Sequence, residues 1–435
     1  MRAPTGTSDQ ASSSGRRSPR RRPANIVHQT IKTSSTSAAS ASSTISTMPW
    51  ILAPRRHRVA AGVAAVLLAA CTSVPLPPER PAPVEEVRPT VPHPPAANAV
   101  ERARSRWVPV DWTELPGWND DRIAEVWPAL RASCGRPAPG WAEVCARAML
   151  EPPADDGTAR AWLARWLQPW RVEAPDGQVD GLATGYFEPL VEAVRQPRGE
   201  FRVPLYGPPA PGTMAKPGWT RQQFDTLPAA KAALRGREIA WVADPLDALL
   251  LQVQGSGRLA LTEADGSRRL VRLAFAGHNE QPYKSVGRWL VERGELTLDT
   301  ASWPAIRAWA RRNPQRVQEM LWANPRVVFF REEPLPDPSI GPRGAQGVPL
   351  VPGRSIAVDA GSIPYGTPVW LDTTEPLSAT PLRRLVVAQD TGSAIVGAVR
   401  ADYFWGWGAD AEAQAGRMKQ PLRLWALWPR GARPQ

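Results

Sequence analysis

Histidine and cysteine are scarce in this sequence of 435 residues, and their scarcity excludes several kinds of catalytic site. There are four histidines and three cysteines. His28, His57 and His93 stand in segments without the apolar pattern of a folded domain. A zinc site built from His and Cys would therefore have too few ligands. A Ser-His-Asp triad would depend on His278, and no Gly-x-Ser-x-Gly motif accompanies it.

Positive charge is concentrated at one end of the chain. The formal net charge is +12, but residues 1–58 hold ten Lys and Arg against Asp9 alone, so nine of the twelve excess charges lie there. The remainder is nearly balanced and lacks the basic surface that binds phosphate backbones. We therefore expect no nucleic-acid partner. The remainder is also long enough to form two packed domains.

The first 104 residues read as three segments outside the folded domains. Residues 1–47 are rich in Ser, Thr and Arg, and are expected to be disordered or to precede a true start at Met48. Residues 48–70 are typical of a signal peptide, with a basic stretch followed by a short apolar run. Residues 71–104 form the expected tether, because nine prolines between positions 74 and 95 favour extended chain.

The apolar run ends in Leu-Ala-Ala-Cys, which resembles a bacterial lipobox and makes Cys71 the expected lipidation site. A short membrane-spanning anchor is the alternative, but the run is shorter than the roughly 20 residues that a span needs. Thr72 in place of Asp favours the outer membrane, by resemblance to lipoprotein sorting, with the protein facing the periplasm. Export also favours a disulfide between Cys134 and Cys145, with two buried free thiols as the alternative.

Helical and strand patterns follow one another in the rest of the chain. Apolar stripes predict helices between Asp121 and Arg171, and their tryptophans are expected in the core. Further predicted helices cover 285–293, 302–311 and 313–322, and strands cover 181–189 and 202–206. After a Pro- and Gly-rich stretch, strands are predicted at 355–359, 363–364, 368–371, 385–390 and 422–428. Short strands joined by glycine turns predict a small barrel, so the fold class is mainly β with flanking helices.

Three aspartates in this last block could carry chemistry: Asp359 in AVDAGSIPYG, Asp390 in AQDTGSAI and Asp402 in RADYFWGWG. Asp402 stands out because four aromatic residues occupy the next five positions. A carboxyl group in apolar surroundings tends to stay protonated, as a general acid must. All three could instead be turn residues that accept backbone N–H groups. No Asp-x-Asp-x-Asp-Gly loop is present, so no metal or cofactor is expected.

Several segments in a fixed order resemble the membrane-bound lytic murein transglycosylase A family. They are TGYFEPLVEA at 184–193, GEFRVPLY at 199–206, LLLQVQGSGRL at 249–259, GHNEQPYKSVGRWLVERGEL at 277–296, ANPRVVFF at 323–330 and the three-aspartate block through residue 429. The likeness covers about residues 105–435. It implies a double-psi β-barrel domain built from 105–188 and 336–435, a second β-rich domain, 189–335, inserted between them, and a substrate groove between the two.

The resemblance also implies an activity and a set of site residues. The enzyme would cut the MurNAc-GlcNAc β-1,4 bond of peptidoglycan glycan strands without water and leave 1,6-anhydro-MurNAc ends. Asp402 would be the catalytic acid and then base, supported by Asp390 and Asp359. The residues expected to bind substrate are Thr184, Tyr186, Glu188, Gln254, Ser256, Gly257, Tyr283 and Lys284. Proteins of wall synthesis are candidate partners.

Two other functions fit the same residues. A hydrolase would use Asp402 with Glu188 or Asp390 as its second carboxylate. A non-catalytic lipoprotein would only bind the wall, in the way that expansin-type barrels are used. Tyr365, Trp405 and Trp407 are candidates for stacking on sugar rings, with core packing as the alternative.

Overall fold

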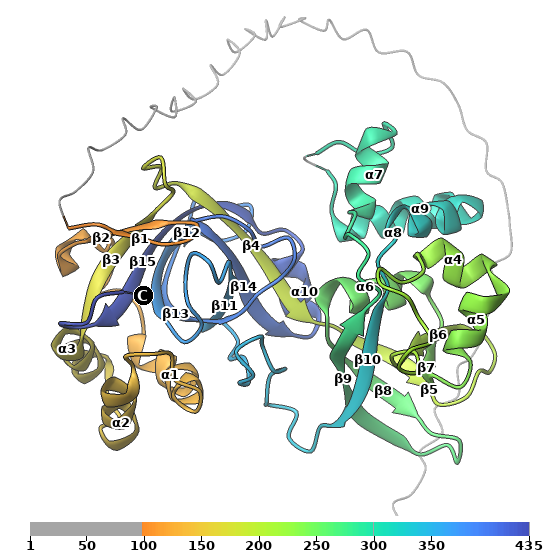
Figure 1. The fold of residues 1–435 in the computed structure, drawn as a ribbon, viewed down its shortest axis with the longest axis horizontal. Helices are drawn as coiled ribbons and strands as arrows, with labels where there is room; N and C mark the ends of the chain where they lie inside the picture. Colours follow the sequence, from red (N-terminus) through yellow and green to blue (C-terminus); the bar gives the residue numbers. More distant parts are fainter. Residues whose placement is uncertain (1–97, 299, 435) are drawn as a thin grey trace, which may run out of the picture. The chain divides into compact units, whose positions relative to one another are not determined.

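The computed structural model describes residues 98–298 and 300–434 (Figure 1). The expected disordered start, the signal peptide, the lipidation site at Cys71 and most of the tether lie outside the described residues. No helix among those described is both long enough and apolar enough to span a bilayer.

Nine strands form one sheet, and six of them close into a ring. The order is β1-β2-β3-β15-β12-β13-β11-β14-β4, and β15 also pairs with β4, which joins the two ends of the last six. Within the ring β11 is parallel to β13 and β14 to β4, and the other neighbours are antiparallel. The bounds are β1 Val100–Glu101, β2 Arg106–Pro109, β3 Leu167–Glu173, β4 Gly181–Glu188, β11 Ser355–Val358, β12 Pro368–Thr374, β13 Pro381–Asp390, β14 Arg400–Trp407 and β15 Lys419–Pro429. This closed ring confirms the predicted barrel.

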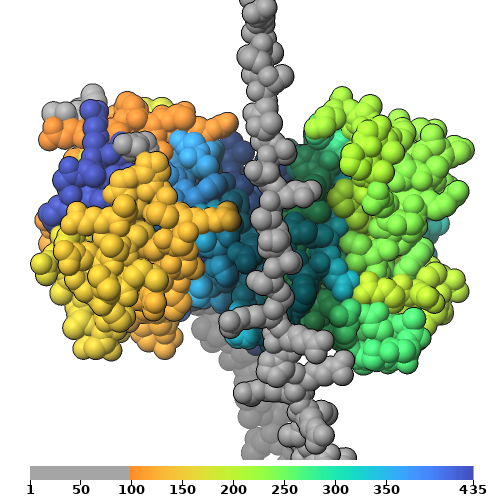
Figure 2. All heavy atoms as spheres, turned by 60° about the horizontal axis from the view of Figure 1, so that its bottom comes forward, coloured from red at the N-terminus to blue at the C-terminus, as the bar shows by residue number. Residues whose placement is uncertain are grey.

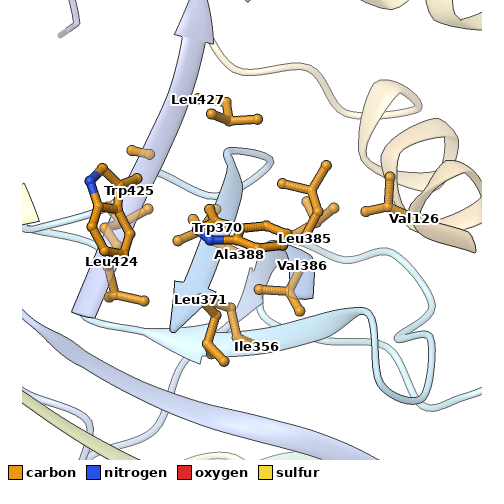
Figure 3. Close-up of a cluster of buried hydrophobic side chains, with 14 of the residues drawn as sticks. Val126, Ile356, Trp370, Leu371, Leu385, Val386, Ala388, Leu424, Trp425 and Leu427 are labelled. Carbon is orange, nitrogen blue, oxygen red and sulfur yellow. The ribbon is translucent and has the colours of Figure 1, made fainter. Parts of the chain in front are cut away.

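Large apolar side chains fill the barrel and hold its strands together. Trp370, Leu385 and Val386 are fully buried, and Figure 3 shows them packed with side chains from β11, β12, β13 and β15. Strands rich in β-branched and aromatic residues favour such packing. Burying each large side chain contributes about 2 kcal/mol, so the core fixes the barrel on which the site residues stand.

A helical segment packs against the barrel between β2 and β3. It contains η1 Trp112–Glu114, η2 Ile123–Val126, α1 Trp127–Cys134, α2 Ala142–Leu150 and α3 Asp156–Trp166. Asp155 begins α3 by accepting a hydrogen bond from the Thr158 amide at 2.7 Å. Trp127 and Trp162 are buried, as their spacing predicted, and their rings meet edge to face. In Figure 2 this segment, in orange and yellow, lies beside the dark blue C-terminal strand.

The second β-rich domain leaves the barrel after β4. Its sheet has the order β10-β9-β8-β5-β7-β6, with β5 Leu190–Val194, β6 Val203–Tyr206, β7 Glu238–Val242, β8 Gly257–Thr262, β9 Arg268–His278 and β10 Val328–Pro334. Its helices are α4 Arg221–Thr226, α5 Pro228–Leu234, α6 Pro245–Gln254, α7 Val286–Glu292, α8 Trp303–Arg312, η3 Pro314–Arg316 and α9 Val317–Ala323. The predicted helices at 285–293, 302–311 and 313–322 are thus present. A barrel with an inserted β-rich domain confirms the predicted architecture.

Two local predictions were wrong, and one strand was not predicted. The helical pattern does not reach Arg171, because residues from Leu167 onward form β3; Pro169 cannot donate a helical hydrogen bond, and the strand pairs with β15. Residues 363–364 form no strand, since the amide of Ile363 closes a turn on the Asp359 carbonyl. Strand β14 was missed altogether. A helix, α10 Ala409–Ala415, follows it.

The structure joins Cys134 to Cys145 in a disulfide that closes a loop of 11 residues between α1 and α2. Such a crosslink restricts the unfolded chain. We predict that Cys134→Ser with Cys145→Ser lowers the free energy of unfolding by about 2 kcal/mol, measured by urea denaturation. A reductant should destabilise the wild type by a similar amount and leave the double variant unchanged. Equal stability of the two proteins would contradict a stabilising role for the disulfide.

Candidate active site

A pocket of about 780 Å³ is lined by residues of the barrel and of the inserted domain. The barrel contributes parts of β4, β13 and β14, together with residues 342–345, 347 and 391–395. The inserted domain contributes the end of α6 and parts of β9 and β10. Pockets of this size, with a few polar groups on a mostly apolar wall, are typical of sites for small ligands.

Asp402 lines this pocket from the middle of β14. It lies opposite Thr184 on β4, whose hydroxyl donates to Asp402 Oδ1 at 2.5 Å. Arg400 in turn donates to the Thr184 hydroxyl at 2.8 Å. Within the part of the chain that the structure describes, Asp402 Oδ2 has no hydrogen-bond partner. One carboxylate oxygen is therefore held in place and the other is available to a ligand.

Burial raises the pKa of Asp402 above its usual value, while the hydrogen bond from Thr184 and the charge of Arg400 oppose this in part. Phe404, two residues along β14, is fully buried and also lines the pocket. Of the four aromatic residues on which the predicted apolar surroundings rested, Phe404 lines the pocket with Asp402, and Tyr403, Trp405 and Trp407 do not. The carboxyl group has the environment of a general acid that ionises in the course of a reaction.

Asp390 lies in the same pocket, at the end of β13, but both its oxygens are engaged. Oδ2 accepts from the Tyr186 hydroxyl at 3.0 Å and Oδ1 from the amide of Ala345 at 2.9 Å. Burial raises the pKa of Asp390 to about 6; hydrogen bonds lower it in part, and the charge of Asp402 adds to the rise. Asp390 therefore orients Tyr186 and the loop at Ala345, and each of its oxygens already accepts a hydrogen bond from the protein.

Asp359 is not among the residues that line the pocket. It accepts from the amides of Gly361 at 2.9 Å and Gly397 at 3.0 Å, and Arg104 lies 3.3 Å away. Gly397 has φ 124, a conformation that favours glycine. Asp359 thus fixes the end of the loop 391–397, whose first five residues line the pocket.

The Gln-Gly-Ser-Gly motif is the turn between α6 and β8. Gly255 ends the helix with φ 78, and Gln254 Oε1 accepts from the amide of Phe187 at 3.1 Å. Gln254 and Ser256 line the pocket, as the resemblance implied. Gly257 is not a pocket residue: it begins β8 and is buried, and a Cβ there would approach Leu251 to 2.0 Å. Its role is close packing.

Glu188 is fully buried in an ion pair outside the pocket lining. It accepts from Arg258 at 2.7 Å and from Arg272 at 2.6 Å. Arg258 also lies over the ring of Trp407 at 3.9 Å. Because two guanidinium groups engage the carboxylate, the structure gives Glu188 a role in joining the end of β4 to β8 and β9.

The remaining predicted residues divide between the pocket and its surroundings. Tyr186 and Tyr283 line the pocket, and Thr184 reaches it through Asp402. Lys284 is exposed and outside the lining. Tyr365, Trp405 and Trp407, the candidate stacking residues, are also outside it.

The pocket contains residues that the sequence did not single out. Phe275 is 46% exposed on its wall, and His278, Arg326 and Arg343 also line it. Arg326 belongs to the ANPRVVFF segment that carried the resemblance, and it is the charged residue of that segment. This charge was the signal by which the sequence could have identified it as a site residue.

Comparison with known proteins agrees with this architecture. The profile of the MltA specific insert domain matches residues 182–331, and that of the 3D domain matches residues 354–428. A protein of Vibrio cholerae named membrane-bound lytic murein transglycosylase A is 32% identical over 276 residues, which cover 61% of this chain and 71% of the relative. The chain belongs to the membrane-bound lytic murein transglycosylase A family.

Solved structures of transglycosylases extend the match over most of the described residues. The lytic transglycosylase LtgG of Burkholderia pseudomallei is 47% identical, with a TM-score of 0.54, and the match covers 78% of this chain and 99% of that one. Escherichia coli MltA with bound chitohexaose is 29% identical, with a TM-score of 0.58 and coverage of 76% and 93%. The predicted family, and with it the assignment as an enzyme, is confirmed.

In this transglycosylase A family member, Glu188→Gln should destabilise the fold by about 3 kcal/mol, because it leaves two buried guanidinium groups without their counter-charge. Urea denaturation measures the change. Glu192→Gln is the matched control: it removes the same charge from a pair that is 64% exposed at the glutamate, and it should change stability little. A Glu188→Gln protein of normal stability and no activity would instead place Glu188 in the chemistry.

Proposed function

We propose that this protein cleaves the MurNAc-GlcNAc bond of peptidoglycan without water and forms 1,6-anhydro-MurNAc ends, with Asp402 as the only proton-transfer group. Its family is that of the lytic murein transglycosylases, whose substrate is peptidoglycan. One observation carries the finer proposal. In a sugar-sized pocket, Asp402 has a raised pKa, one oxygen fixed by Thr184 and the other free.

In the proposed reaction Asp402 gives one proton to the substrate and later accepts one from it. Protonated Asp402 donates its proton to the glycosidic oxygen, the bond from that oxygen to C1 of MurNAc breaks, and GlcNAc leaves as an alcohol. The C6 hydroxyl of the same MurNAc then attacks C1, and Asp402, now a carboxylate, accepts the hydroxyl proton. The substrate's 2-acetamido group can assist at C1. The products balance the substrate with no water consumed.

Thr184 fits both halves of this cycle. Its hydroxyl donates to Asp402 Oδ1 and accepts from Arg400, so it stabilises the carboxylate after the first proton transfer. Burial acts in the opposite direction and favours the protonated form. Burial and the hydrogen bond from Thr184 thus act on the pKa of Asp402 in opposite directions, and burial is the larger effect.

Among the described residues, Asp390 is the other carboxyl group of the pocket lining and both its oxygens accept protein hydrogen bonds, which favours this route over hydrolysis. Hydrolysing glycosidases use one carboxyl group as acid and another as base or nucleophile. Within residues 98–298 and 300–434, the two nearby candidates are already engaged, Asp390 by two donors and Glu188 by two arginines. An internal C6 hydroxyl has a high effective molarity and replaces the second carboxylate.

The ligand of a relative supports a glycan in the pocket. Escherichia coli MltA was solved with chitohexaose, a chain of acetamido sugars. The pocket offers polar groups from Gln254 and Ser256 and exposed apolar surface from Phe275. We propose that the glycan binds along these residues, with the scissile bond at Asp402.

We further propose that the protein is anchored to the outer membrane through lipid on Cys71 and faces the periplasm. Curated relatives are named membrane-bound. Peptidoglycan lies on the periplasmic side of that membrane, so a tether between Cys71 and β1, which begins at Val100, would let the enzyme reach it. Partnership with wall-synthesis proteins stays a prediction from the resemblance.

Replacing Asp402 by Asn keeps the shape of the side chain and removes the transferable proton. We predict a fall in turnover on the order of a thousandfold, with glycan binding retained, measured as soluble fragments released from purified murein. Asp410→Asn, in the exposed first turn of α10, is the matched control and should behave as wild type. If Asp390→Asn abolishes turnover and Asp402→Asn does not, Asp390 is the acid.

Thr184→Val tests the effect of the hydrogen bond between the Thr184 hydroxyl and Asp402 Oδ1 on the pKa of Asp402. Because the Thr184 hydroxyl lowers the pKa of Asp402, its removal should raise that pKa further. The reaction needs protonated Asp402 at its start, so activity falls as pH rises through this pKa, and in the variant that fall should move to higher pH. The dependence of kcat/KM on pH measures the shift. An unchanged profile, or one moved to lower pH, would contradict the assignment.

A further inference from the structure

Arg326 is a cation on the pocket wall. It lies between α9 and β10, and its Nε donates to the carbonyl of Gln281 at 2.7 Å. Its Nη1 donates to the Ser393 hydroxyl at 3.0 Å. Among the described residues no Asp or Glu forms an ion pair with Arg326, and Nη2 has no hydrogen-bond partner there.

The other arginines of the pocket differ from Arg326. Arg272 is paired with the buried Glu188, and Arg331 is paired with Glu333 at 2.8 Å. Arg343 has no acidic partner among the described residues either, but it is exposed and its Nη1 donates to a carbonyl of its own loop at 3.1 Å. Arg326 thus differs from the other arginines of the pocket: it is partly buried, and within the described chain only neutral groups hold it in position.

Side chains around Arg326 add further donors. Its charge opposes protonation of His278, whose pKa is lowered first by burial and then by Arg326. It also acts on Tyr283, whose pKa burial raises and Arg326 partly lowers. Both residues line the pocket with Arg326 and Ser393. A guanidinium fixed on two sides beside hydroxyl groups is an arrangement that binds carboxylates.

In peptidoglycan, the substrate of the proposed function, the carboxylates lie on the substituent at O3 of MurNAc. The sugar backbone of acetamido groups and hydroxyls is uncharged. MurNAc bears a lactyl group on O3, which ends in a carboxylate or continues as a stem peptide with carboxylates of its own. We propose that Arg326 binds a carboxylate of this O3 substituent and so determines the preference for muramyl strands over neutral glycans; the proposal rests on peptidoglycan being the substrate.

Binding to three ligands tests this proposal, in an Asp402→Asn background that prevents turnover. The ligands are glycan strands with stem peptides, strands stripped of peptide so that the lactyl carboxylate is free, and neutral chitohexaose. Arg326→Gln should weaken binding of at least one charged ligand about tenfold or more, the loss expected for a charge-assisted hydrogen bond. Chitohexaose affinity should change less than about twofold. Whichever charged ligand loses affinity identifies the carboxylate.

Control variants separate charge from structure. Arg235→Gln removes an exposed positive charge of the inserted domain outside the pocket, and it should leave all three affinities unchanged. Ser393→Ala removes a neighbour of Arg326 but keeps the cation, so the preference for charged ligands should persist. Arg326→Lys keeps the charge and should retain part of the preference, which supplies a second test if Arg326→Gln is unstable.

Equal weakening of all three ligands by Arg326→Gln would show a structural role and overturn the proposal, as would no weakening of any. The comparison is independent of the catalytic assignment. If turnover assays show that Asp402 is not the acid, an Asp390→Asn background serves the same binding experiment.

Discussion

The parallel pairing of β4 with β14 is the constraint on which the site depends. It places Thr184 opposite Asp402, 218 residues away along the chain, and allows the hydrogen bond that fixes one oxygen of the carboxyl group. Two parallel neighbours need a long connection between them. Here that connection contains the inserted domain, which leaves at the end of β4 and so contributes the opposite wall of the pocket. The same pairing thus positions Asp402 and the surface that faces it.

The environment of each carboxyl group decides its role. Asp402, Asp390, Asp359 and Glu188 all lie in or near this region, yet they differ in what surrounds them. Two arginines hold Glu188, backbone amides hold Asp359, and a tyrosine and an amide hold Asp390. Asp402 alone of these four combines burial, one neutral donor and one free oxygen within the described chain. The proposal of a single proton-transfer group rests on that difference.

Much of this arrangement could be predicted from the sequence, for reasons that differ between residues. The aromatic run after Asp402 indicated an apolar environment, and the ordered motifs indicated a barrel with an insertion. Strand β14 was missed because it contains glycine and a bulge between Phe404 and Trp407, and its strand character depends on neighbours far away in the chain. The Thr184–Asp402 contact and the arginines around Glu188 also arise from long-range pairing, which local patterns do not encode. Gly257 appeared to be a ligand residue because a short motif does not distinguish close packing from close approach to a ligand.

The origin of the oxygen at the new sugar end tests the central claim most directly. Murein would be digested to completion in water enriched in heavy oxygen, and the fragments weighed by mass spectrometry. If the C6 hydroxyl closes the ring under a single carboxyl group, the MurNAc ends carry no solvent oxygen and are lighter by one water than reducing ends. Heavy oxygen at C1 of those ends would show that water is the nucleophile and would contradict the account.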